Sequence, residues 1–242
     1  MITNHEILWD EEHVARIWNY YSQNRSYDHQ YFAHHSGRYI IDYVVRFLDL
    51  NGKTILDFGC GTGFLLDQLM TRTNGKSKYV AADTSRQSID LINKKFRSNP
   101  EFTTGYLINN LPIEMHDKSA DIIFCVELVE HLPEDQLNTI FKELLRILTP
   151  RGNIVVTTPN RENLEENKTI CPECGCIFHR WQHLISWTTE TLKNRMEKVG
   201  FKTVHVGETV FQSKKLNMLS QAIAYLKRNP IVKPHLIYIG TK

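Results

Sequence analysis

The sequence predicts an α/β protein with a doubly wound, mostly parallel seven-stranded sheet and helices on both faces. Three observations lead to this prediction. Short β-branched or aromatic segments alternate with helical segments over residues 53–158, which is the pattern of a parallel sheet. A glycine-rich turn joins the first of these strands to a helix. Two strand-like segments near the C-terminus would complete the sheet as an antiparallel edge.

The predicted elements follow in chain order. Helical periodicity covers about residues 11–21 and 35–49. The five strands of the alternating region are Lys53–Phe58, Tyr79–Asp83, Phe102–Leu107, Asp121–Val126 and Asn153–Thr158. Helices are expected between them near 63–71, 84–97 and 134–148. After Pro159 the pattern breaks for about thirty residues, and such a long irregular segment is usually functional or disordered.

Regular structure is expected again in the last quarter of the chain. A helix is predicted near 188–199 and strands near 201–207 and 235–240. Between these strands an amphipathic helix is predicted from the spacing of Leu216, Leu219, Ile223 and Leu226.

The composition is that of an ordinary globular protein. The chain has 242 residues, of which 41% are hydrophobic and 23% are charged, so we expect a single domain over residues 1–242. No apolar run approaches the roughly 18 residues of a membrane span. Residues 1–12 lack the cationic and apolar pattern of a secretory signal. We therefore expect a cytoplasmic protein with reduced thiols and no membrane partner.

Charge is unevenly distributed although the formal net charge is only +2. Residues 1–50 hold seven acidic residues against four arginines, whereas residues 190–242 hold ten basic residues against three glutamates. A basic C-terminal quarter could meet a polyanion. The scattered positions also fit an ordinary solvated surface.

The sharpest motif is the turn that contains Gly59, Gly61 and Gly63, between a predicted strand and a predicted helix. Glycines at such a turn adopt positive φ and let the backbone approach a ligand closely. The spacing differs from the Gly-x-Gly-x-x-Gly fingerprint of dinucleotide sites, because Phe64 stands where that fingerprint has its third glycine. A flavin or nucleotide site on a generic Rossmann fold is the alternative interpretation.

This turn resembles motif I of class I S-adenosylmethionine-dependent methyltransferases, and the resemblance extends over about residues 40–210. It implies a Rossmann-like fold and a site for S-adenosylmethionine, with Asp57 as the acid at the strand end. Asp83, followed by Thr84, ends the next strand, where a carboxylate can accept hydrogen bonds from ribose hydroxyls. The family's adenine-contacting aspartate is missing before Leu111-Pro112, and Asn109 or Asn110 is the candidate substitute.

Glu127, Glu130 and His131 follow the fourth strand of the alternating region. The carboxyl ends of strands line the ligand crevice of an open α/β sheet, so these side chains could bind a divalent cation or act as acid–base groups. The segment resembles the Glu-x-x-Glu-His of two families. These are the small-RNA 3′-terminal 2′-O-methyltransferases, where it holds a divalent metal together with a distant His, and the ubiquinone-biosynthesis O-methyltransferases.

The distant histidine also has a counterpart in this sequence. His183 precedes Trp187-Thr188 by the spacing found in the RNA family, and residues 157–161 precede the long loop as they do there. The resemblance therefore implies that Glu127, Glu130, His131 and His183 form a site for Mg²⁺ or Mn²⁺. The alternative is that His131 merely caps or packs the turn.

Three cysteines lie close together in the inserted segment 160–187. The Cys171-Pro-Glu-Cys174-Gly-Cys176 sequence is typical of half of a zinc ribbon. Structural zinc needs four ligands, and we expect Cys171, Cys174, Cys176 and His179 if His183 serves the active site. A Cys₂His₂ site that uses His179 and His183, or a turn without metal, are the alternatives.

The preferred function is O-methylation of a small hydroxylated metabolite with the help of a divalent metal. The alternatives are 2′-O-methylation of an RNA 3′ end and a non-catalytic, cofactor-binding docking module. Residues 1–50 are expected to form a helical lid. Within it, the segment 18–32, which carries Tyr20, Tyr21, Tyr27 and Tyr31, would fold over the cofactor because aromatic faces attract a sulfonium cation. Ordinary core packing would also explain these tyrosines.

Overall fold

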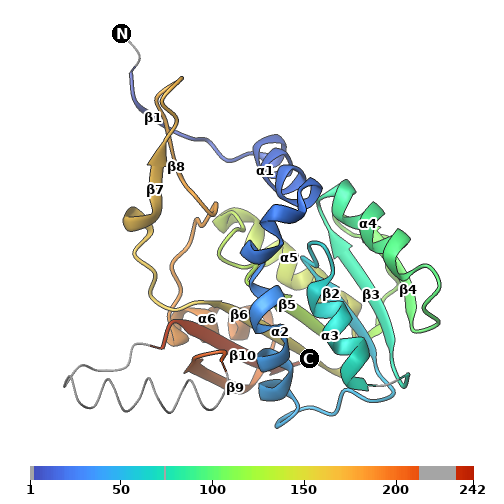
Figure 1. The fold of residues 1–242 in the computed structure, drawn as a ribbon. Helices are drawn as coiled ribbons and strands as arrows, with labels where there is room; N and C mark the ends of the chain where they lie inside the picture. Colours follow the sequence, from blue (N-terminus) through green and yellow to red (C-terminus); the bar gives the residue numbers. More distant parts are fainter. Residues whose placement is uncertain (1–2, 74, 213–232) are drawn as a thin grey trace, which may run out of the picture.

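The computed structural model describes residues 3–73, 75–212 and 233–242. Its main sheet has seven strands in the order β4-β3-β2-β5-β6-β10-β9, as Figure 1 shows. The strands are β2 (Thr54–Phe58), β3 (Lys78–Asp83), β4 (Phe102–Leu107), β5 (Ala120–Val126), β6 (Leu148–Pro159), β9 (Lys202–Thr209) and β10 (His235–Thr241). Neighbours pair in parallel from β4 to β6, whereas β10 is antiparallel to both β6 and β9. The predicted fold class is confirmed.

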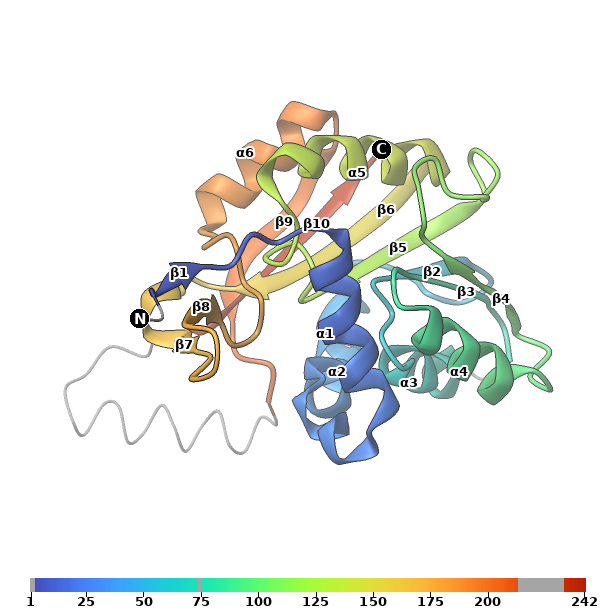
Figure 2. The ribbon, with the colours of Figure 1, turned by 90° about the horizontal axis from the view of Figure 1, so that it is seen from above.

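Helices cover both faces of the sheet (Figure 2). One face carries α5 (Glu134–Ile147) and α6 (Thr189–Val199), and the other carries α2 (Phe32–Val44), α3 (Phe64–Thr73) and α4 (Arg86–Phe96). The core is split accordingly. In β5, Ile123 and Cys125 pack toward α5, whereas Ile122 and Phe124 pack toward α2 and α3. Since successive strand residues point to opposite faces, a strand buried on both sides reads as a continuous apolar run.

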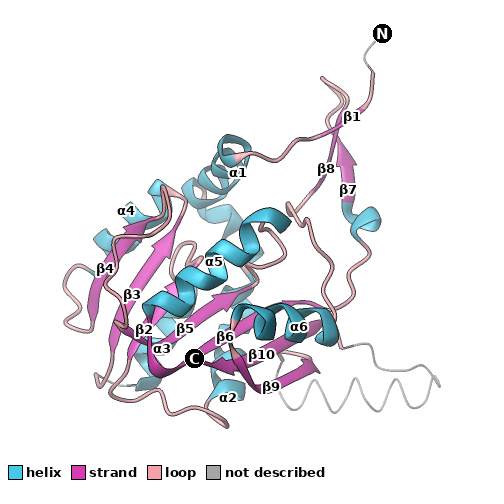
Figure 3. Cartoon of the chain, turned by 180° about the vertical axis from the view of Figure 1, so that it is seen from behind, coloured by secondary structure: helices cyan, strands magenta, loops and turns pink. Residues whose placement is uncertain are grey.

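A second, three-stranded sheet stands apart from the main sheet (Figures 1 and 3). It consists of β1 (His5–Glu6), β8 (Cys176–His179) and β7 (Lys168–Ile170), with β1 parallel and β7 antiparallel to β8. A short 3₁₀ helix, η2 (Leu164–Asn167), precedes it. The prediction of an irregular segment after Pro159 is therefore wrong for this hairpin, because strands of three or four residues leave too little alternation to recognise.

The remaining N-terminal elements are α1 (Glu11–Gln23) and the 3₁₀ helix η1 (Arg25–Gln30). Asp10 caps α1 by accepting a hydrogen bond from the backbone N–H of His13. The helix predicted over 35–49 begins earlier and ends at Val44, and turns follow it. The amphipathic helix predicted around Leu216 to Leu226 lies outside the described residues. Among the helices that the structure describes, none has the length and apolar character needed to span a bilayer.

Candidate active site

The glycine turn lies between β2 and α3, at the carboxyl end of the sheet, where ligands of open α/β folds bind. Gly59, Gly61 and Gly63 all have positive φ, of 80°, 50° and 83°. A side chain at Gly61 would place its Cβ 2.8 Å from Cε1 of Tyr31. Any other residue would be strained at these positions, so the sequence pattern reflects a real backbone requirement.

Asp83, at the end of β3, fastens the turn. Its Oδ2 accepts a hydrogen bond from the Gly61 N–H at 2.9 Å, and its Oδ1 accepts one from the Ser85 N–H at 2.7 Å. Burial raises the pKa of Asp83, and these backbone hydrogen bonds oppose the rise. The carboxylate that was predicted to hold the ribose therefore also shapes the glycine turn.

Asp57, the strand-end acid of β2, is only 2% exposed, and its Oδ2 has no hydrogen-bond partner. Burial, reinforced by the charge of Asp83, raises the pKa of Asp57 to about 8. A buried carboxyl without a donor is costly. This position therefore fits a ligand that brings a positively charged or N–H group.

The other predicted cofactor residues lie at the same edge. Thr84 directly follows Asp83 and is exposed. Asn109 and Asn110 are exposed just beyond β4, and the Ile108 N–H binds the Asp83 carbonyl at 2.9 Å, which holds this segment beside β3. No hydrogen bond of either asparagine side chain occurs among the described residues, so both amides are free to meet a ligand.

Residues 127–131, which include two glutamates and a histidine, follow β5 and contact the segment after β8. The structure brings Glu130, His131 and His183 together, with one possible ligand atom from each lying within 4.8 Å of the others. The rings of His131 and His183 meet edge to face at 4.8 Å. Glu130 is 1% exposed. Burial, followed by the charge of His183, lowers the pKa of His131 to about 3, which keeps its imidazole neutral.

In each of these three side chains, one polar atom lies close to a partner outside the group. Oε2 of Glu130 accepts a hydrogen bond from the Thr158 hydroxyl at 2.9 Å, while its Oε1 is buried without a partner. Nδ1 of His131 lies 3.3 Å from the Gln182 carbonyl oxygen, and Nδ1 of His183 lies 2.5 Å from a carboxylate oxygen of Glu162. Each residue keeps one further ligand atom, Oε1 of Glu130 or Nε2 of a histidine. Hydrogen bonds of this kind on the other atom orient metal ligands.

Glu127, the fourth predicted ligand, lies slightly apart from this group. Its backbone has a φ of 46°, in the left-handed region, and its N–H binds the Thr157 carbonyl at 3.0 Å. One carboxylate oxygen is 3.5 Å from Nδ1 of His235, and the other is buried without a partner. The Glu127 carboxylate lies near Glu130, whose pKa is raised first by burial and then by this neighbouring charge.

Sequence reasoning missed Glu162, Gln182 and Trp18. Gln182 is fully buried, with a φ of 60°. Its side chain donates to the His131 carbonyl at 2.9 Å and accepts from the Trp18 indole N–H at 2.8 Å. A carboxylate three residues beyond β6 was a detectable signal for Glu162. The contacts of Gln182 and Trp18 depend on the tertiary structure and have no such signal.

The predicted zinc ligands lie at two places in the structure. Cys171, Cys174 and Cys176 lie at the tip of the β7–β8 hairpin, where the Cys171 N–H binds the Cys176 carbonyl at 2.8 Å. His179, at the other end of β8, instead forms a group with Glu162 and His183. Among the described residues no group of three possible ligand atoms includes a cysteine. A strand separates His179 from the turn, which sequence spacing did not reveal.

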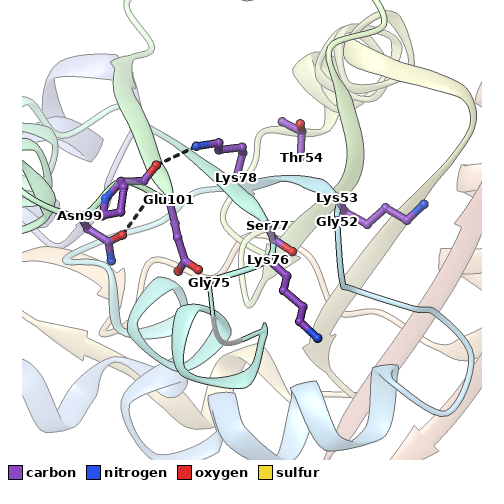
Figure 4. A pocket seen from close by; sticks show the side chains of 10 residues that line it. Gly52, Lys53, Thr54, Gly75, Lys76, Ser77, Lys78, Asn99 and Glu101 are labelled. Atoms are coloured by element: carbon purple, nitrogen blue, oxygen red, sulfur yellow. Dashed lines mark hydrogen bonds between the residues drawn. The ribbon is translucent and has the colours of Figure 1, made fainter.

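A pocket of about 470 Å³ lies at the opposite, amino-terminal end of β2 and β3 (Figure 4). Its lining includes Lys53, Lys76 and Lys78, and the Lys78 ammonium donates to the Pro100 carbonyl at 2.8 Å. None of the predicted site residues lines it. Chemistry in doubly wound folds belongs to the carboxyl end, so we assign the site to the glycine turn and the histidine cluster.

The chain is similar to known methyltransferases. The methyltransferase domain family matches residues 27–206. The chain is 25% identical over 178 residues to a small RNA 2′-O-methyltransferase of Arabidopsis thaliana, covering 66% of this chain and 19% of that protein. It is 30% identical over 122 residues to the ubiquinone biosynthesis O-methyltransferase of Coxiella burnetii, covering 50% of each. The chain thus spans half or less of the length of these relatives.

Solved structures give the same fold. The methyltransferase in a complex with the Haloferax volcanii Trm112 methyltransferase activator superposes with a TM-score of 0.67 at 14% identity, covering 93% of this chain and 96% of that one. A Mesorhizobium loti S-adenosylmethionine-dependent methyltransferase gives 0.62 at 16% identity, covering 84% and 98%. The chain therefore belongs to the methyltransferase domain family and has the fold of S-adenosylmethionine-dependent methyltransferases.

Proposed function

We propose that the protein is an S-adenosylmethionine-dependent O-methyltransferase that acts on a small hydroxylated molecule with the help of a divalent metal. The observation that carries the metal is the Glu130, His131 and His183 group, in which one possible ligand atom of each residue lies within 4.8 Å of the others and another atom of each contacts a partner outside the group. Glu127 is the fourth ligand of the proposal. Two imidazoles and two carboxylates suit Mn²⁺ better than Mg²⁺, which prefers oxygen ligands.

The cofactor residues fit S-adenosylmethionine by their chemistry. The free oxygen of buried Asp57 would accept a hydrogen bond from the ammonium group of the methionine part. Asp83 would accept hydrogen bonds from the ribose hydroxyls. The side-chain amide of Asn109 or Asn110 would hydrogen-bond the polar edge of adenine. Tyr31, which packs against Gly61, would cover the same region from the N-terminal segment.

The chain's own residues would then divide the reaction between them. Bound S-adenosylmethionine would supply a methyl group on a sulfonium, and a bound divalent ion would lower the pKa of an acceptor hydroxyl. The glycine turn and Asp83 fix one reactant, and the cluster around Glu130 fixes the other. Trp18, whose ring meets that of His131 at 5.0 Å, closes the cluster on one side. Holding two reactants in line supplies most of the benefit in such a transfer.

Charge favours a small acceptor over RNA. Residues 1–12 and 160–187, which include the second sheet and the loop beside the cluster, contain eight acidic and three basic residues. An acidic surface repels a phosphate backbone. RNA remains the second candidate because the match to the small RNA 2′-O-methyltransferase covers 66% of the chain.

A labelled-methyl experiment tests the proposal. Protein and S-adenosylmethionine with a labelled methyl group are incubated with a metabolite extract or with small RNA, with and without a chelator. Label in the small-molecule fraction that disappears with chelator and in Glu130→Gln supports the proposal. Label confined to RNA overturns the acceptor, full activity with excess chelator overturns the metal, and cofactor binding without any transfer identifies a docking module.

The cysteine turn carries a separate proposal, that Cys171 and Cys174 bind zinc together with Cys176. The backbone N–H groups of Cys174 and Glu173 lower the pKa of the Cys171 thiol, in that order, which favours a thiolate. Gly175, with a φ of 74°, makes the tight turn possible. The described hairpin supplies three sulfurs, so the fourth ligand would come from water or from another group.

A further inference from the structure

Glu162 is a carboxylate whose oxygens are both engaged. Oε2 lies 2.5 Å from Nδ1 of His183, and Oε1 accepts from the Asn167 side-chain amide at 3.0 Å. Oε1 also lies 3.4 Å from Nε2 of His179. With an amide N–H donating to one oxygen and an imidazole nitrogen facing the other, Glu162 presents the two acceptor oxygens of a carboxylate.

An ionised acceptor determines which nitrogen of His183 carries the proton. A carboxylate can only accept, so Nδ1 of His183 must donate. Nε2 is then the nitrogen with the free lone pair. Since Nδ1 is committed to Glu162, Nε2 is the atom that His183 can offer to the group with Glu130 and His131.

His179 lies on the other side of Glu162. Its Nδ1 accepts hydrogen bonds from the backbone N–H groups of His183 at 3.1 Å and Trp181 at 3.3 Å. A neutral His179 must therefore carry its proton on Nε2, the atom near Glu162. Its ring stacks on that of His183 at 4.7 Å with an interplanar angle of 19°. With its lone pair used by the backbone, His179 belongs to the support of the site and cannot act as a neutral metal ligand.

We propose that Glu162 is a positioning residue that holds His183 in the tautomer with Nε2 free and directed to the Glu130–His131 side. Its consequence for metal binding rests on the proposed function, whereas the tautomer itself does not. Outer carboxylates of this kind typically change metal affinity 10–100-fold when removed. Glu162 is therefore expected to matter for the site although it touches no reactant.

Nitrogen NMR of histidine-labelled protein tests the tautomer without metal, cofactor or substrate. The spectrum is recorded at about pH 8, above the usual pKa of histidine, and His183→Gln identifies the signals. Wild type should show a protonated Nδ1 and a free Nε2 on His183. Glu162→Ala should shift the proton toward Nε2, and Glu162→Gln, which keeps an acceptor oxygen, should retain the wild-type form. A wild-type proton on Nε2, or an unchanged tautomer in Glu162→Ala, overturns the proposal.

Mn²⁺ titration supplies the second readout. Glu162→Ala should bind Mn²⁺ roughly 10–100-fold more weakly and Glu162→Gln less so, while Glu166→Gln, at an exposed glutamate of the 3₁₀ helix η2 that follows Glu162, should match wild type. Equal Mn²⁺ affinity in wild type and Glu162→Ala contradicts the positioning role but leaves the proposed function intact. If wild type binds no Mn²⁺, the metal part of the proposed function fails, and the NMR experiment still decides the role of Glu162.

Discussion

The buried carboxyl of Asp57, whose Oδ2 has no hydrogen-bond partner, makes the stability of the protein depend on pH. Burial, with the charge of Asp83, raises its pKa from 3.8 to about 8. Between these values the folded protein binds more protons than the unfolded chain, so the free energy of unfolding falls as the pH rises from 3.8 to about 8. At higher pH the penalty for the buried charge is fully present.

Asp57→Asn should therefore unfold at a higher temperature than wild type above pH 8. We expect a gain of roughly 1–2 kcal/mol, because the amide carries no charge to bury. The difference should shrink toward pH 4. Thermal unfolding of the ligand-free proteins across this range is the measurement, and parallel pH profiles for the two proteins would contradict the placement of Asp57.

Asp83→Ala should weaken S-adenosylmethionine binding on the order of 30–150-fold, or about 2–3 kcal/mol, through loss of a charged two-oxygen acceptor. Loss of the hydrogen bond from Gly61 adds to the effect by loosening the glycine turn. Asp90→Ala, at an exposed position of α4, is the matched control. Calorimetric affinity equal to wild type in Asp83→Ala would exclude the assigned role.

Single residues differ in how well the sequence predicts them. Asp57, Gly61 and Asp83 follow from local rules, because a strand end and a turn fix their surroundings. Gln182 could not be found in this way, since its partners His131 and Trp18 are 51 and 164 positions away along the chain. His179 lies at the opposite end of β8 from Cys176, a separation that spacing alone does not reveal.

At the scale of elements, the β7–β8 hairpin gives a metal prediction of its own. Purified protein should contain about one zinc per chain. Cys171→Ser or Cys174→Ser should each lose it, because each change removes one of the thiolates that would hold the ion. Glu173→Gln in the same turn should keep the metal. Elemental analysis measures the zinc content of each protein. Native protein without zinc would contradict the proposal that the cysteine turn binds the metal.

The main sheet was more predictable than this hairpin. All seven of its strands were expected, since strands of five to twelve residues are long enough for β-branched and aromatic residues to show a pattern. Strands β7 and β8 have only three and four residues, too few for periodicity to show. Strand β8 also pairs with β1, more than 160 residues away along the chain.

At the scale of the whole molecule, α1 fastens the N-terminal segment to the candidate active site. Trp18→Phe should keep an aromatic ring beside His131 but leave the side-chain oxygen of buried Gln182 without its donor. The expected loss of stability is roughly 1–3 kcal/mol. Tyr20→Phe, on an exposed face of the same helix, should cost less. Chemical denaturation followed by circular dichroism compares the two variants, and equal midpoints would argue against the Trp18–Gln182 contact.

Two adjacent residues of α1 form hydrogen bonds with two different parts of the candidate active site. Trp18 binds Gln182 beside the histidine cluster, while the Asn19 side-chain oxygen accepts from the Ser85 hydroxyl at 2.7 Å, two positions from Asp83. Because one helix contacts both places, a ligand that shifts α1 at one of them would also be felt at the other. If the bound methyl donor tightens ion binding at the cluster by some factor, the bound ion must tighten donor binding by the same factor, because a thermodynamic cycle has to close.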